Sequence, residues 1–276
     1  MDKGVKTGEA GQPLADDEAL LAGAVQAAGE LALSFFGRGL VGTRKVDDTP
    51  VSEADLAVDR FLHERLAMAR PAYGWLSEES ADRPERLEAR RVWIVDPIDG
   101  TRAFLAGLPD WTISAALVED GQPVLAAIFN PKMSEFFAAR RGRGSALNGN
   151  PIAVPARDRL EGSRIFANKG LLRRKIWTEP WPRTRNVWAN SITYRLALIA
   201  AGRADAALSI TRKAEWDLAA AALLVQEAGG KVTDASGAAM RFNRPRPHIN
   251  GLVAAAPALH ELLIARTRLV AAVDEI

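Results

Sequence analysis

The chain of 276 residues contains no cysteine and only three histidines. The absence of cysteine excludes disulfide bonds, thiolate zinc sites and cysteine nucleophiles. The histidines (His63, His248 and His260) show no metal-ligand spacing, so we interpret them as incidental to function. No stretch approaches the roughly 20 apolar residues that a membrane-spanning helix needs. We therefore expect neither a membrane span nor chemistry that depends on thiols or clustered imidazoles.

Charge of one sign is also scarce, because 36 Lys and Arg residues nearly balance 34 Asp and Glu residues, for a net charge of +2. This balance does not indicate binding to a nucleic acid polymer or to a membrane surface. A hydrophobic content of 48% with 25% charged residues is typical of a soluble globular protein. The N-terminus lacks the apolar core of a signal peptide, so we expect a cytoplasmic location.

The pattern of elements indicates an α+β fold. Residues 1–13 are polar and predict a flexible tail. Alternating strands around Asp120-Gly121 predict a hairpin, and separate helices follow in the second half of the chain. Helix signals begin at or just before residues 16, 52, 191, 217 and 258. We divide the chain into an N-terminal half, residues 14–155, with most candidate metal ligands, and a C-terminal half, residues 156–276, which supplies Asp217 and the substrate pocket.

The most informative stretch runs from Trp93 to Thr101. An apolar strand reaches Val95, and Asp96-Pro97-Ile98-Asp99-Gly100-Thr101 follows it. Proline and glycine are expected to end the strand pairing, which places both carboxylates on a turn just beyond the strand. Two adjacent carboxylates repel each other unless a proton or a cation neutralises them, and oxygen ligands suit hard cations such as Mg²⁺. The alternative is an ordinary hairpin turn, since Asp, Pro and Gly all favour turns.

Three other acidic positions have both a local and a functional interpretation. Asp55 follows Ser52 in a helix-capping box. Glu78, in Ser77-Glu78-Glu79-Ser80, follows a short strand, where paired glutamates are usually surface charge. Asp217 stands in the first turn of a helix, where the helix dipole favours an anion. Each of these acids can hold its structural role and still face a common site.

Taken in order, these motifs resemble those of the inositol monophosphatase superfamily of metal-dependent, lithium-sensitive phosphomonoesterases. The resemblance extends from about Ala19 to Leu262. It is carried by Lys45…Thr49-Pro50-Val51-Ser52-Glu53-Ala54-Asp55, by Ser77 to Ser80, by Trp93 to Thr101, and by Glu215-Trp216-Asp217 with Glu227-Ala228-Gly229-Gly230.

The resemblance implies a layered α-β-α-β-α sandwich, often homodimeric, whose site holds two to three Mg²⁺ ions. Glu78, Asp96 and the Ile98 carbonyl would bind one ion. Asp96, Asp99 and Asp217 would bind a second ion, and a looser third would bind mainly through Glu78. Thr101, linked to Asp55, would activate the attacking water, and the Gly100 and Thr101 amides would receive the phosphate.

The chemistry agrees with this composition. A phosphate monoester is a dianion that repels a water nucleophile, and paired metal ions neutralise that charge while they acidify the water. Such catalysis needs no cysteine, histidine or serine nucleophile. A catalytically inactive regulator on the same fold is the alternative from another functional class. It would require a missing ligand, and none is missing.

The resemblance implies that the substrate is a small phosphate monoester, and the motifs leave its identity open. Ile210 stands seven residues before Asp217, where inositol-specific members are expected to place an acid, and Asn190-Ser191-Ile192 replaces a smaller pocket turn. Met240-Arg241-Phe242-Asn243 and Leu76 to Ser80 look more like the bacterial 3'(2'),5'-bisphosphate nucleotidases of the CysQ type, although Ala103 replaces an acid usual there. We therefore predict hydrolysis of the 3'-phosphate of adenosine 3',5'-bisphosphate. The alternative substrates are inositol 1-phosphate and other polyol, sugar or histidinol phosphates. The residues assigned to substrate binding are Gly100, Thr101, Ser191, Arg195, Arg212 and Lys213.

Overall fold

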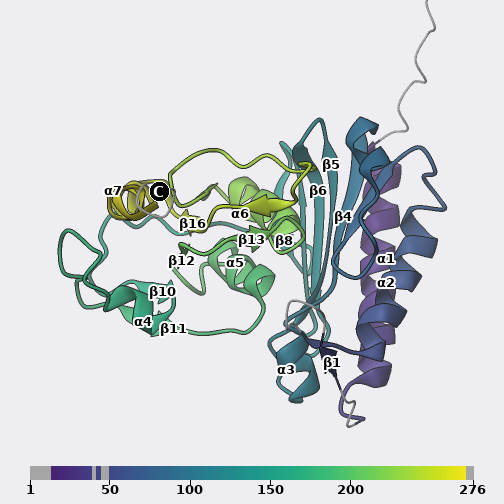
Figure 1. Ribbon diagram of the computed structural model, residues 1–276, viewed down its shortest axis with the longest axis horizontal. Helices are drawn as coiled ribbons and strands as arrows, with labels where there is room; N and C mark the ends of the chain where they lie inside the picture. Colours follow the sequence, from purple (N-terminus) through teal and green to yellow (C-terminus); the bar gives the residue numbers. More distant parts are fainter. Residues whose placement is uncertain (1–13, 39–41, 45–49, 272–276) are drawn as a thin grey trace, which may run out of the picture.

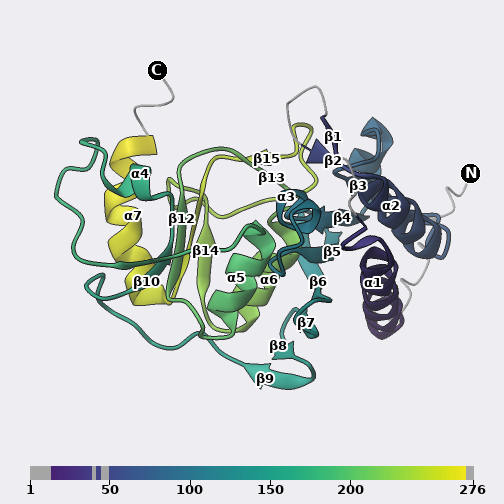
Figure 2. The same cartoon turned by 90° about the horizontal axis from the view of Figure 1, so that it is seen from below.

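The computed structural model describes residues 14–38, 42–44 and 50–271. Two main sheets and three layers of helices alternate across the molecule, as Figures 1 and 2 show. This arrangement is the layered α+β sandwich that the motifs imply. The tail at residues 1–13 and the segment Lys45 to Thr49 of the first motif lie outside the described residues.

The first sheet has seven strands in the order β3-β4-β5-β6-β7-β8-β9. Only β3 and β4 pair in parallel, and the other neighbours are antiparallel. The hairpin predicted at Asp120-Gly121 joins β5 to β6, and both of its turn residues have positive φ angles. The strand bounds are β3 Gly74–Ser77, β4 Arg91–Asp99, β5 Thr112–Glu119, β6 Gln122–Asn130, β7 Glu135–Arg140, β8 Gly144–Leu147 and β9 Asn150–Ile152.

Strand β4 corrects one expectation from the sequence. Pairing with β5 does not stop at Pro97, because Asp99 still pairs with Thr112 after a register shift that follows Asp96. The strand absorbs the proline in this irregularity, where its missing N–H removes no regular ladder bond. Both acids therefore lie within the distorted end of a buried strand, and the turn begins only at Gly100.

Helices α1 (Leu14–Phe35) and α2 (Glu53–Leu66) cover one face of the first sheet. In α1 the buried residues Leu21, Ala24, Val25, Ala28 and Ala32 recur at helical spacing, so they form one apolar stripe that packs on the sheet. Short elements close the edge of this layer: β1 (Thr43–Arg44), β2 (Pro50–Val51), the 3₁₀ helix η1 (Pro84–Glu88) and α3 (Thr101–Leu105).

The opposite face of the first sheet packs on α5 (Ile192–Ala200) and α6 (Ala219–Glu227), which Figure 2 shows between the two sheets. Helix α6 is buried along all of its sides, which explains why its sequence is alanine- and leucine-rich without a polar face. The helical layer brings the N-terminal ends of α5 and α6 toward the end of β4. This placement determines where the candidate site forms.

The second sheet has five strands in the order β11-β10-β12-β16-β14, and α7 covers its outer face. A separate pair, β13 and β15, lies beside the interior helices. The bounds are β10 Arg164–Phe166, α4 Lys169–Leu172, β11 Arg185–Val187, β12 Ala206–Ser209, β13 Lys213–Ala214, β14 Lys231–Thr233, β15 His248–Ile249, β16 Leu252–Ala255 and α7 Pro257–Ala271.

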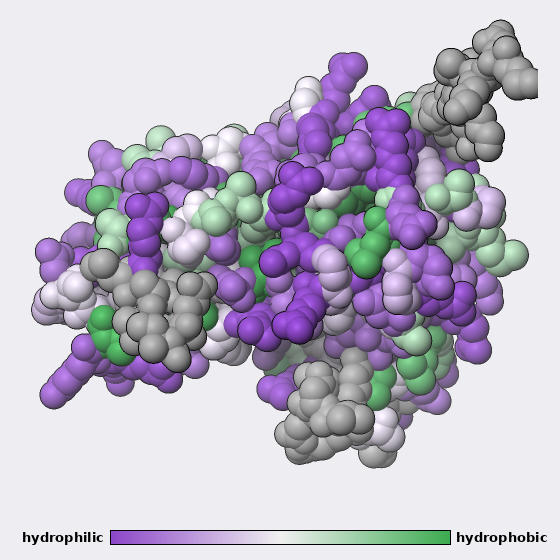
Figure 3. Space-filling view, turned by 45° about the horizontal axis from the view of Figure 1, so that its top comes forward, coloured by the Kyte–Doolittle hydropathy of each residue, from purple (hydrophilic) through white to green (hydrophobic). Residues whose placement is uncertain are grey.

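The described surface in Figure 3 is largely hydrophilic, with apolar residues in small separate areas. Among the described residues, no helix combines the length and the apolar character that crossing a membrane requires.

Candidate active site

Three aspartates meet where the first sheet faces the interior helices. Asp96 and Asp99 come from the end of β4, and Asp217 comes from the turn just before α6. Each offers a carboxylate oxygen that lies within 4.8 Å of the oxygens of the other two. Glu78 follows β3, the parallel neighbour of β4, and its backbone N–H donates to the Val95 carbonyl at 3.3 Å. Because parallel neighbours end at the same sheet edge, Glu78 joins the aspartates there.

A cavity of about 320 Å³ opens over this cluster. Its lining includes all four acids together with the turn that begins α3. The residues are Glu78, Asp96, Ile98, Asp99, Gly100, Thr101, Arg102, Trp188, Asn190, Arg195 and Asp217. The structure thus brings together in one cavity all five residues that the sequence assigns to metal binding.

The Asp96 carboxylate is the least satisfied group of the site. The side chain is 1% exposed, and neither oxygen has a hydrogen-bond partner among the described residues. Burial raises its pKa well above the usual value, and the nearby charges of Glu78 and Asp99 raise it further. Burial and the same neighbours also raise the pKa of Asp217. A buried carboxylate without donors is costly, and a bound cation removes both the penalty and the repulsion. The oxygen-only donor set therefore fits a hard divalent cation such as Mg²⁺.

Thr101 is held at the cavity wall by two acceptors. Its hydroxyl lies 3.0 Å from Asp55 Oδ1 and 3.1 Å from the Ile98 carbonyl oxygen. The other Asp55 oxygen accepts from the Ser52 N–H at 2.8 Å and from the Ser52 hydroxyl at 2.5 Å. Asp55 therefore serves both as the helix-capping acid of α2 and as the partner of Thr101. The two interpretations of this residue are compatible in one geometry.

Asp99 is oriented by the start of α5. The Ser191 hydroxyl and the Thr193 N–H each donate to Asp99 Oδ2 at 2.6 Å. Ser191 is fully buried, and its oxygen also accepts the Tyr194 N–H at 2.8 Å as the helix cap. Because Ser191 has no exposed surface, the structure places it behind Asp99, whereas the sequence assigned it to direct substrate contact. Its neighbour Asn190 lines the cavity instead.

The turn that carries Asp217 is anchored by a buried glutamate. Glu215 accepts the backbone N–H groups of Asn243 at 2.6 Å and Arg244 at 3.1 Å. Burial raises the pKa of Glu215 to about 7, against the lowering effect of these donors. The Asn243 side chain in turn bonds Arg86, whose guanidinium donates to Asn243 Oδ1 at 2.6 Å. This network ties the Asp217 turn to η1 of the first half of the chain.

A second cavity of about 880 Å³ adjoins the first and shares Asp99, Asp217 and Arg195 with it. Its wall is basic: Arg212 and Lys213 also line it. Burial lowers the pKa of both Arg195 and Lys213, while the nearby Asp99 opposes the shift in each. Cationic side chains thus stand immediately beside the acidic cluster.

An aromatic platform lies at the boundary of the two cavities. The Trp188 ring is 63% exposed, and the Arg195 guanidinium carbon lies 4.4 Å from its centroid. The Arg195 side chain also donates to the Ala189 carbonyl at 2.6 Å, which fixes its direction. Ile210 lines the second cavity, and its side chain cannot accept a hydrogen bond from a substrate hydroxyl.

Sequence reasoning missed several polar residues that support the site. Asp110 accepts from the Asn190 N–H at 2.5 Å, and Asp59 holds the serines that flank Glu78. Trp188 likewise has no recognisable motif role, and the Met240 to Asn243 stretch gave no sign that Asn243 contacts Glu215 and Arg86. These partners come together only through the tertiary fold, because residues tens of positions apart leave no spacing signal in the sequence.

Comparison with known proteins agrees with this architecture. A model of the inositol monophosphatase family matches residues 16–271. An inositol-1-monophosphatase of Rhizobium meliloti is 40% identical over 195 residues, which cover 68% of this chain and 73% of that protein. A 3'(2'),5'-bisphosphate nucleotidase CysQ of Aggregatibacter actinomycetemcomitans is 31% identical over 244 residues, or 82% of this chain and 87% of that protein.

The fold comparison gives the same result. The solved structure of a Thermotoga maritima IMPase superposes with a TM-score of 0.78 at 27% identity, over 94% of this chain and 99% of that one. The match of the family model covers nearly every described element, and the carboxylate cavity lies within the matched residues. The chain belongs to the inositol monophosphatase family of phosphatases.

Proposed function

We propose that the protein is a Mg²⁺-dependent phosphomonoesterase that removes the 3'-phosphate from adenosine 3',5'-bisphosphate. The observation that carries this proposal is the basic cavity beside the carboxylate cluster. One phosphate of the substrate would lie over Asp96, Asp99 and Asp217, and the second would meet the cations of the adjoining cavity. Charge-assisted contacts of this kind are stronger than neutral hydrogen bonds.

Glu78, Asp96, Asp99, Asp217 and the Ile98 carbonyl are the groups that would hold two to three Mg²⁺ ions. The bound ions would neutralise the phosphate charge, acidify the attacking water and stabilise the leaving oxygen. The cluster supplies only oxygen donors, and burial leaves Asp96 in need of a cation.

Thr101 would position the attacking water. Its single hydroxyl hydrogen is shared between Asp55 and Ile98, so its oxygen lone pairs remain to accept a proton from water in the cavity. Asp55 is buried and bonded to Ser52, and it would take the hydroxyl proton of Thr101 while Thr101 takes a proton from the attacking water, so the threonine stays neutral. Gly100 and Thr101 begin α3, where their backbone N–H groups would receive the phosphate oxygens.

Trp188 and Arg195 support a nucleotide as the substrate. A purine base can stack on the exposed indole, and Arg195 is already held in place over the same ring. Ile210 gives the cavity an apolar wall where inositol hydroxyls would need acceptors. Inositol 1-phosphate remains the main alternative, since the Rhizobium relative is named for that activity. Other polyol, sugar or histidinol phosphates would use the same chemistry.

The first experiment measures phosphate release from adenosine 3',5'-bisphosphate and from inositol 1-phosphate, each with and without Mg²⁺. We expect Mg²⁺-dependent release with a higher kcat/KM for the nucleotide. Equal or faster turnover of inositol 1-phosphate would reverse the order of substrates. Absence of Mg²⁺-dependent release from any phosphate monoester in a wider panel would contradict the phosphatase assignment itself.

The Asp99→Asn variant tests the metal cluster directly. We expect a loss of several orders of magnitude in kcat with an unchanged circular dichroism spectrum, because the amide cannot supply the bridging charge. Asp158→Asn is a matched control, since Asp158 is an exposed acid outside both cavities, and it should retain wild-type turnover. Near-wild-type activity of Asp99→Asn would contradict the proposed mechanism.

A further inference from the structure

A buried aspartate outside the catalytic cavity holds both ends of the turn that carries Glu78. Asp59 lies on α2, one helical turn after Asp55, and is 8% exposed. Its Oδ1 accepts the Ser77 hydroxyl at 2.5 Å, and its Oδ2 accepts the Ser80 hydroxyl at 2.6 Å. The two serines flank Glu78, so one carboxylate spans the turn from its first residue to its last.

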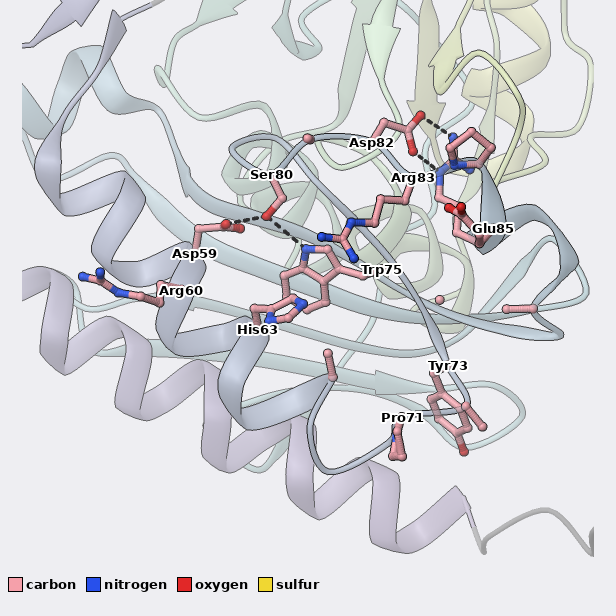
Figure 4. A pocket seen from close by; sticks show the side chains of 17 residues that line it. Asp59, Arg60, His63, Pro71, Tyr73, Trp75, Ser80, Asp82, Arg83 and Glu85 are labelled. Carbon is pink, nitrogen blue, oxygen red and sulfur yellow. Dashed lines mark hydrogen bonds and ion pairs between the residues drawn. The ribbon is translucent and has the colours of Figure 1, made fainter.

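The direction of these hydrogen bonds is determined by the other partners of the serines. The Trp75 indole N–H donates to Ser80 Oγ at 3.2 Å, and the Glu79 N–H approaches Ser77 Oγ at 3.4 Å. Each serine oxygen therefore accepts an N–H and gives its own hydrogen to Asp59. Figure 4 shows the Trp75–Ser80–Asp59 arm of this arrangement. A carboxylate accepts at both oxygens, whereas an amide accepts at only one.

Asp59 is separated from the reacting groups. With Trp75 and Ser80 it lines an outer groove of about 1070 Å³, which is the pocket drawn in Figure 4. Glu78 lines the catalytic cavity and is absent from the lining of this outer groove. The turn thus stands between the two spaces, with Asp59 on the outer side and Glu78 on the catalytic side.

We propose that Asp59 is a positioning residue that sets the Glu78 carboxylate for metal binding. This inference rests on the proposed metal chemistry of the site. The Glu78 N–H bond to Val95 anchors the turn to β4, and the Asp59 contacts hold Ser77 and Ser80 on either side of Glu78. Groups that orient a metal ligand from behind typically change metal affinity about 10- to 100-fold when they are replaced.

The test is a titration of the metal-free protein with Mn²⁺ alone. Binding is measured by calorimetry and by the electron paramagnetic resonance signal of free Mn²⁺. In the Asp59→Asn variant, the amide nitrogen replaces one carboxylate oxygen, so one of the two serine hydroxyls loses its hydrogen-bond acceptor. We expect the dissociation constant of the Glu78-dependent site to rise about 10- to 100-fold. Turnover should fall at limiting Mg²⁺ and recover largely at saturating Mg²⁺.

Glu64→Gln is the matched control, because Glu64 is an exposed acid on the same helix, and it should bind Mn²⁺ like the wild type. Ser80→Ala breaks one arm and keeps the carboxylate, so it should show a smaller loss of affinity even if Asp59→Asn does not fold. A purely structural role would lower the melting temperature and leave the affinity of the folded protein unchanged.

The outcomes separate the two proposals. Wild-type protein that binds no Mn²⁺ would overturn the proposed metal chemistry. If the wild type binds Mn²⁺ and the Asp59→Asn and Ser80→Ala variants bind it with the same affinity, only the proposed role of Asp59 is overturned.

Discussion

At the scale of single residues, Asp96 shows that a cluster of buried acids has an unfavourable free energy in the absence of a cation. Its carboxylate is buried among other acids and has no hydrogen-bond partner among the described residues. Asp99, by contrast, has two donors from the start of α5. The free-energy cost of burying a carboxylate without donors therefore falls mainly on Asp96.

The Asp96→Asn substitution should have opposite effects on the free energy of unfolding in the absence and in the presence of metal. In EDTA above neutral pH we expect it to be more stable than the wild type, because burial and the charges of Glu78 and Asp99, which raise the pKa of Asp96, disfavour the carboxylate and not a neutral amide. With Mg²⁺ at 100 times its dissociation constant, the wild type should gain about 2.7 kcal/mol and the variant much less. Urea denaturation of the wild type and the variant, in EDTA and with Mg²⁺, measures both differences in the free energy of unfolding. A variant that is less stable than the wild type in EDTA would refute this account.

Single residues also show what sequence reasoning can reach. The acids Glu78, Asp96, Asp99 and Asp217, which the resemblance of their short motifs marks as candidate metal ligands, lie in one cavity, and their role as ligands stays a prediction. Ser191 was placed on the substrate, but it is buried and bonds Asp99. The sequence shows only that a serine is present at this position. Whether the serine caps a helix and bonds a carboxylate, or contacts the substrate, depends on its surroundings in the fold.

At the scale of elements, helix α1 shows how closely a helix approaches the first sheet. Gly29 faces β6, and a Cβ atom at this position would lie 2.3 Å from Phe129 Cδ1 and 2.9 Å from Pro131 Cγ. Gly23 lies on the same helix but is exposed, and nothing lies within 4 Å of a Cβ atom there. The two glycines therefore have different reasons to be present.

Alanine at these two positions should have opposite effects. Gly23→Ala should stabilise the protein by about 0.5–1 kcal/mol, because alanine is the better helix former. Gly29→Ala should destabilise it by about 1–3 kcal/mol, because the added methyl group forces α1 away from the sheet or displaces Phe129. Thermal and urea unfolding of the two variants give the comparison. Equal effects of the same sign would show that α1 packs less closely than the structure indicates.

Elements were predictable where their signals are local. The capping box at Ser52 and the Asp120-Gly121 hairpin have the expected positions. The end of β4 was not predictable, because a proline normally stops strand pairing and only the tertiary structure shows that Asp99 still pairs with Thr112.

At the scale of the whole molecule, α7 packs on the second sheet through a buried histidine. His260 Nε2 lies 2.9 Å from Thr233 Oγ1 of β14, and the other ring nitrogen has no partner among the described residues. Burial lowers the pKa of His260 to about 4; Lys231 lowers it further, while Glu261 opposes the shift. The folded protein therefore keeps this imidazole neutral under conditions in which the unfolded chain binds a proton.

Stability should consequently fall with acidification in a defined range. The unfolded chain takes up a proton on His260 below pH about 6.5, and the folded protein does so only near pH 4. Between these values His260 contributes a loss of at most about 1.4 kcal/mol for each pH unit, and the loss ends below the folded-state pKa. Urea unfolding at pH 7, 6 and 5 measures the slope.

The matched variants are His260→Gln and His248→Gln. The first should reduce the slope between pH 6.5 and 4, whereas the second, at an exposed histidine, should retain it. An unchanged slope in His260→Gln would contradict the assignment.

The four carboxylates reach the site from distant parts of the chain. Asp96 and Asp99 lie in β4 of the first sheet and Glu78 directly follows β3, whereas Asp217 comes from the turn between β13 and α6. During synthesis from the N-terminus, a nascent chain that has emerged only through the first sheet carries three of these acids and lacks the fourth. The complete ligand set therefore exists only late in translation. A product truncated before Asp217 cannot assemble the cluster, however well its first sheet is formed.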